Sequence, residues 1–96
     1  MNGMGSMLGL TISFRHGKVL AAYLTLGREE GHRVARSERT PQGLVIDYDA
    51  DGKEIGIEVP TPCAETVQAL LAKMRELNLE DPERELSPMR RAMARV

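Results

Sequence analysis

Apolar and polar residues alternate along the first part of the chain. The alternation runs over residues 8–15 and again over residues 19–26, and His16-Gly17 lies between the two runs. A period of two is typical of a strand with one buried face, so the sequence predicts two strands joined by a turn. Placing Phe14 opposite Leu20 puts both apolar rows on the same face, and we expect this register.

Three further strands are expected before residue 60. A mostly polar strand covers residues 32–40 and ends at Pro41-Gln42, where proline presets a two-residue turn. Asp51-Gly52 predicts a two-residue hairpin turn between strands 43–49 and 53–59, because both positions of that turn adopt positive φ. The resulting register places three apolar pairs on one face: Leu44 with Val59, Ile46 with Ile57, and Tyr48 with Ile55.

After residue 60 the pattern changes to helical spacing. Thr61 is the expected N-cap, and Pro62 suits the first position of a helix near residues 62–78. Apolar side chains recur along one stripe of this helix: Val67, Leu70, Leu71, Met74 and Leu77. We expect the stripe to cover the apolar face of the sheet. Ser87-Pro88 repeats the start signal and precedes a short, methionine-rich stripe.

Together these elements predict the α+β class. We expect a small antiparallel meander of about five strands, with an amphipathic helix packed on one face and a short terminal helix. Residues 8–79 would form the single domain, 1–7 a disordered N-terminus, and 80–96 a helical C-terminal extension. A 96-residue chain buries a modest core, so association with another chain would help its stability. The extension can order against such a chain, pack on its own sheet, or stay disordered.

Composition and charge disfavour several classes of protein. The net charge is −1 and aromatic residues make up 3% of the chain, so neither a basic surface nor stacking rings favour nucleic acid. No apolar run approaches the roughly 20 residues of a membrane span, and no secretory signal is visible. Cys63 is the one cysteine, so no internal disulfide can form, and we expect a cytoplasmic protein.

One acidic segment matches the calcium-loop pattern of EF-hands. Asp47, Asp49, Asp51 and Glu58 occupy ligand positions of D-x-D-x-D-G followed by Glu after five residues. We favour a hairpin over a metal site, because alternating residues rather than helices flank the segment. A divalent-cation or hydrolytic site on this acidic face, which also carries Glu54, is the alternative.

The charge pairs expected around this hairpin indicate what kind of partner it would bind. A two-residue turn at Pro41-Gln42 would place Arg36 opposite Asp47, as a favourable cross-strand pair. Asp49 opposite Glu54 would be an unrelieved like-charge pair, which suits a cation or a small basic protein.

No catalytic constellation or cofactor motif is visible. Cys63 is expected in the first turn of the long helix, but nothing places His16 or His32 beside it, and a nucleophilic cysteine needs a base. We therefore expect no cofactor and no enzymatic activity. The expected function is a protein-interaction module, a homo-oligomer or a complex with a small basic protein, with five contact candidates: Asp49, Glu54, Met89, Arg90 and Met93.

The run from Gly43 to Val59 resembles the signature of the bacterial family catalogued as domain of unknown function 2283. The resemblance lies in the Asp47-x-Asp49-x-x-Gly52 turn followed by Gly56-Ile57-Glu58, and it extends over roughly residues 12–60 through Ala22-Tyr23-Leu24 and Val34-Ala35-Arg36-Ser37-Glu38. It implies a small sheet-rich fold without an established activity. Some members are suspected antitoxin-like partners of small ribonuclease toxins. The resemblance therefore implies an antitoxin-like role for this chain as an expectation.

Overall fold

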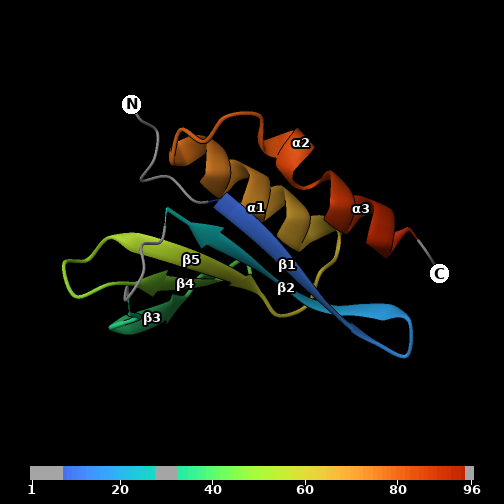
Figure 1. Ribbon diagram of the computed structural model, residues 1–96, viewed down its shortest axis with the longest axis horizontal. Coiled ribbons are helices and arrows are strands. Elements are labelled where there is room, and N and C mark those ends of the chain that lie inside the picture. The colour runs from blue at the N-terminus through green and yellow to red at the C-terminus, as the bar shows by residue number, and fades with distance from the viewer. Residues whose placement is uncertain (1–7, 28–32, 95–96) are drawn as a thin grey trace.

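The chain folds into one sheet with helices on one of its faces (Figure 1). The computed structural model describes residues 8–27 and 33–94. The strands are β1 (Leu8–Arg15), β2 (Lys18–Leu26), β3 (Arg36–Arg39), β4 (Val45–Tyr48) and β5 (Glu54–Val59). The helices are α1 (Ala64–Glu76), α2 (Pro82–Glu85) and α3 (Ser87–Met93). The predicted α+β class with a five-stranded antiparallel sheet is confirmed.

The strands are arranged in the order β1-β2-β5-β4-β3. β3, β4 and β5 form a three-stranded meander, and β2 pairs with β5, which is therefore the central strand. Exposure accounts for this order. All four residues of β3 are exposed, whereas Ile55, Ile57 and Val59 of β5 are completely buried. The polar strand thus takes an edge and the most apolar strand takes the centre. β3 is also shorter than the predicted 32–40, of which residue 32 lies outside the described residues.

The β1–β2 hairpin follows the predicted register up to its tip. Ile12 lies opposite Ala22, as expected, but the register then shifts by one residue. The prediction that Phe14 faces Leu20 is therefore wrong: Phe14 faces Val19, and Leu20 is the extra residue of a β-bulge. The turn end of this hairpin extends past the other strands in Figure 1.

The other two hairpins have loops one residue longer than predicted. The Thr40 amide donates to the Leu44 carbonyl at 2.8 Å, and the Asp49 amide donates to the Lys53 carbonyl at 2.9 Å. Each three-residue loop ends on a glycine with positive φ, 93° at Gly43 and 83° at Gly52. This is the loop in which a type I turn precedes a left-handed glycine, so Asp51 does not need positive φ.

These longer loops change the predicted cross-strand partners. Arg36 lies opposite Tyr48 instead of Asp47, whose partner is Ser37. Tyr48 lies opposite Glu54 instead of Ile55, so the expected Asp49–Glu54 pair is also wrong. A bulge between Asp47 and Tyr48 restores the register, and the predicted pairing of Ile46 with Ile57 is present.

The long helix starts later than predicted. Its N-cap is Cys63 instead of Thr61, and Pro62 precedes the helix. Thr66 determines this start, because its hydroxyl accepts a hydrogen bond from the Cys63 amide at 2.9 Å and donates to the Thr61 carbonyl at 3.0 Å. Thr61 therefore contributes its carbonyl to the helix start.

A left-handed residue ends α1. Asn78 has φ 60°, and the amides of Asn78 and Leu79 donate to the carbonyls of Arg75 and Met74, both at 3.0 Å. This is the Schellman arrangement, which glycine occupies with less strain than any other residue.

We expect Asn78→Gly to raise the free energy of unfolding by about 0.5 kcal/mol and Asn78→Ala to lower it by about 1 kcal/mol, measured in urea. Greater stability of the alanine variant would contradict this assignment.

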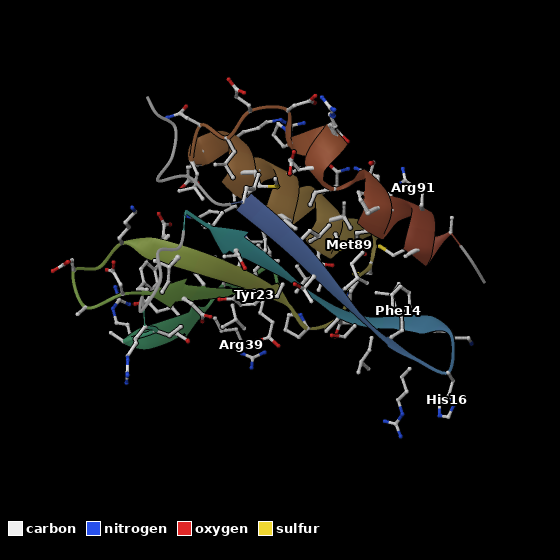
Figure 2. The ribbon with its side chains drawn as sticks, viewed as in Figure 1. Phe14, His16, Tyr23, Arg39, Met89 and Arg91 are labelled. Atoms are coloured by element: carbon white, nitrogen blue, oxygen red, sulfur yellow. The ribbon has the colours of Figure 1, made fainter. Side chains whose placement is uncertain are left out.

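The C-terminal segment belongs to the same core as the sheet. Leu86 and Met89 have no exposed surface, and they pack with residues of α1 and the sheet. α3 contacts β2, and Met89 lies between α3 and the sheet in Figure 2. Among the three expected states of the extension, the described part, residues 80–94, is packed on its own sheet.

Candidate interaction surface

The carboxylate of Asp47 is held on the face of the sheet opposite the helices. It accepts hydrogen bonds from the Tyr23 hydroxyl at 2.7 Å and from the Ser37 hydroxyl at 2.6 Å. Tyr23 reaches β4 from β2 by crossing Gly56 of the intervening strand β5, where the Cβ of any larger residue would overlap its hydroxyl. Asp47 therefore joins strands, and its two oxygens are both engaged.

Asp49 shapes the loop that follows β4. Its side chain is nearly buried, and one carboxylate oxygen accepts hydrogen bonds from the amides of Asp51 at 2.9 Å and Lys53 at 2.8 Å. This local bonding is characteristic of aspartate in turns. Asp51 itself is exposed in the loop. Asp49 thus stabilises the hairpin and presents little surface to a partner.

Glu54 lies on the other face and contacts a helix. Its carboxylate is 2.5 Å from the ammonium of Lys73 on α1, which also bonds Glu76 at 3.1 Å. The hydrogen bond to Glu54 is the main cause that raises the pKa of Lys73 above its ordinary value of 10.5, and partial burial opposes it. Glu54 therefore ties β5 to α1.

This ion pair predicts a pH dependence. The folded protein holds the Lys73 proton more tightly than the unfolded chain does, so the pair stabilises fully below pH 10.5 and loses its effect as pH rises through the raised value. We expect Lys73→Met to cost up to about 1 kcal/mol at neutral pH and progressively less as pH rises through the raised pKa of Lys73, measured by urea unfolding. The exposed Lys18→Met is the control, and a cost for Lys73→Met that grows with pH would contradict the assignment.

The residues of the calcium-like pattern are thus divided between different places. Asp47 and Glu58 lie on strands of the sheet, Asp49 and Asp51 lie in the loop, and Glu54 faces α1. Within residues 8–27 and 33–94, no three histidine, cysteine or acidic side chains are grouped as metal ligands would be.

The contact candidates on α3 have different environments. Met89 is completely buried, so its assignment to a contact surface is wrong; its apolar side chain completes the core. Arg90 is exposed and lies 3.4 Å from Glu83, whereas Met93 packs partly against the core. Arg90 and Met93 line one groove of about 270 Å³ beside the start of α1. Of the three contact candidates on α3, Arg90 and Met93 therefore line the same groove.

Cys63 has a structural role at the start of α1. Its sulfur lies 3.5 Å from the Thr66 hydroxyl. The pKa of Glu65 is lowered by a hydrogen bond from its own amide and, secondly, by one from the Cys63 thiol. Cys63 therefore takes part in the side-chain bonding that caps the helix start. His16 lies at the distant tip of the β1–β2 hairpin in Figure 2, and His32 lies outside the described residues.

The sequence reasoning missed a surface at the β1 edge of the sheet. Phe14 and Leu20 at the hairpin tip are 53% and 51% exposed, the two most exposed large apolar residues of the described chain. β1 pairs with β2 on one side, and none of the described strands pairs with its other side. The run from Leu8 to Phe14 carries no charged residue. This uncharged run was visible in the sequence, but its place at an edge was not.

The opposite edge of the sheet has contrasting chemistry. β3 is four residues long, and three of them, Arg36, Glu38 and Arg39, are charged. Arg36 forms an ion pair with Glu38 and stacks 4.0 Å over the Tyr48 ring, while Arg39 points away from the helices in Figure 2. Short, charged edges discourage pairing with another strand, whereas long, uncharged edges invite it. Among the described residues, the β3 edge is therefore protected by its charges, and no such charges protect the edge from Leu8 to Phe14.

No helix among the described residues combines the length and apolar character needed to cross a membrane. Comparison of the chain with protein-family models, with curated proteins and with solved structures found no match. The resemblance to domain of unknown function 2283 therefore stays a prediction.

Proposed function

We propose that the protein is a non-enzymatic, cytoplasmic interaction module that binds another polypeptide by strand addition to β1. The observation that carries this proposal is the contrast between the charged, four-residue β3 edge and the eight-residue β1 edge, which carries no charge before Arg15 at its end. Strand addition uses backbone hydrogen bonds for affinity and alternate side chains for selectivity. β1 offers both, because its unpaired edge is bordered by a half-buried apolar row that ends at Phe14.

The acidic hairpin contributes to this function indirectly. Asp47, Asp49 and Glu54 are bonded to other groups of the same chain, so they support the sheet that presents β1. An antitoxin-like role is a narrower form of the proposal, and it requires a toxin that supplies the added strand.

A photo-crosslinking amino acid tests the proposed surface. Benzoylphenylalanine at position 14 keeps an aromatic side chain at the exposed hairpin tip, and the same group at Ser37 probes the charged edge as a matched control. We expect irradiation of cells to give a covalent adduct of defined mass from position 14 and none from position 37. The adduct should weaken when Thr11→Lys places a charge on β1. Absence of an adduct from position 14, or an adduct from position 37 alone, would contradict the proposal.

A further inference from the structure

The unpaired strand has a chemical symmetry about its centre. Reading outward from Thr11, the residues form like pairs on either side: Leu10 with Ile12, Gly9 with Ser13, and Leu8 with Phe14. Each pair combines two apolar or two small residues. The run is thus palindromic in character, and Thr11 is its midpoint.

Such a palindrome is complementary to itself in the antiparallel direction. A two-fold dimer requires a patch that fits its own copy, and antiparallel strands place residues on either side of the axis opposite each other. We infer that the occupant of the β1 edge is a second copy of this chain, paired antiparallel with the axis at Thr11. This inference rests on the proposed function and names its partner.

The pairing matches the environments of the side chains. On the face covered by helices, Leu8, Leu10 and Ile12 are only partly buried and Phe14 is 53% exposed. The second copy would place Phe14 beside its Leu8 and Ile12 beside its Leu10, covering this row. On the other face, pairs of Gly9 with Ser13 and of Thr11 with Thr11 are small, and threonine pairs across strands are favourable.

The same geometry explains why such an assembly stops at two chains. An assembly in which β1 of one copy paired with β3 of the next copy would propagate without closing. β3 opposes this, because it carries charges at three of its four positions and is half as long as β1. The two-fold pairing uses both β1 edges and leaves only β3 edges outside.

Charge substitution at the two-fold axis gives the first test, measured by sedimentation equilibrium. The purified chain is expected to be a dimer of twice 10.6 kDa. Thr11→Lys and Thr11→Glu each place like charges opposite each other, and we expect each to weaken self-association about fivefold or more. An equimolar mixture should restore it, which shows that both variants are folded. Ser37→Lys on β3 is the control and should remain dimeric. A monomer at all concentrations, or undiminished association of both single variants, would overturn the inference.

Cysteine cross-linking tests the register in a Cys63→Ser background. At the axis, facing residues are about 5 Å apart between Cα atoms, within reach of a disulfide, so oxidised Thr11→Cys should form a covalent dimer. Two copies of Ser13→Cys would be about 13 Å apart along the strands and should not. Efficient cross-linking at position 13, or none at position 11, would overturn this register.

The two proposals fail in different ways. A position-14 adduct with a different protein, together with a monomeric purified chain, would overturn the second-copy inference and leave the interaction surface intact. Absence of any position-14 adduct, together with a monomeric chain, would overturn both. A position-14 adduct of twice the chain mass, with restored association in the Thr11 mixture, is the result expected if both hold.

Discussion

Gly56→Ala is expected to lower the free energy of unfolding by about 2 kcal/mol, a large effect for one methyl group. Gly56 lies on the central strand, and the Tyr23 side chain crosses directly over it to reach Asp47. The added Cβ would overlap the tyrosine hydroxyl, so the ring must move away and lose its hydrogen bond to the carboxylate. Urea unfolding at a fixed protein concentration measures this cost.

Two comparisons separate this overlap from a general effect of strand glycines. Gly9→Ala on β1 adds a Cβ into open space, so we expect a change below about 0.5 kcal/mol. In a Tyr23→Ala background the obstruction is gone, and Gly56→Ala should then cost little. Additive costs of the Tyr23 and Gly56 substitutions would show that the tyrosine does not require the glycine.

Met89→Ala is expected to lower the free energy of unfolding by about 3 kcal/mol. The side chain is completely buried among residues of the sheet and α1, so its removal leaves a cavity in the core. A methionine on a mobile extension would give almost no effect. Urea unfolding of the full chain distinguishes the two cases.

Neighbours on α3 provide the controls for Met89. Met93→Ala should cost less, because Met93 is only partly buried, and Arg90→Ala should change stability by less than about 0.5 kcal/mol. Equal effects of Met89→Ala and Arg90→Ala would contradict the packing of α3 on the sheet.

Local patterns predicted where most of the strands lie, but they did not predict the lengths of the hairpin loops that set the strand register. Period-two alternation correctly located β1, β2, β4 and β5, because each has one row of apolar side chains that lie in the core or pack against it. The Asp51-Gly52 turn was read one residue too short. Two-residue and three-residue hairpin loops both favour a glycine in this position, and the choice moves the partners next to the turn by one residue, so that Glu54 faces Tyr48.

Long-range arrangement accounts for the remaining differences at the candidate surface. Nothing in the sequence of β1 says that it lies at an edge, because strand order depends on which strands the helices cover. Met89 was assigned to a contact surface since a short methionine-rich helix has the same pattern whether it packs on its own sheet or on another chain. Ser37 lies opposite Asp47 in place of the predicted Arg36, because the loop after Thr40 is one residue longer than predicted.

Residue-resolved amide hydrogen exchange, measured by NMR on the purified protein, tests most directly whether β1 pairs with another strand. Amides that point outward from an unpaired edge exchange fast, and pairing protects them. We expect the outward amides of residues 8–14 to be protected and those of residues 36–39 on the β3 edge to exchange rapidly. Equally fast exchange of outward amides at both edges would contradict pairing through β1.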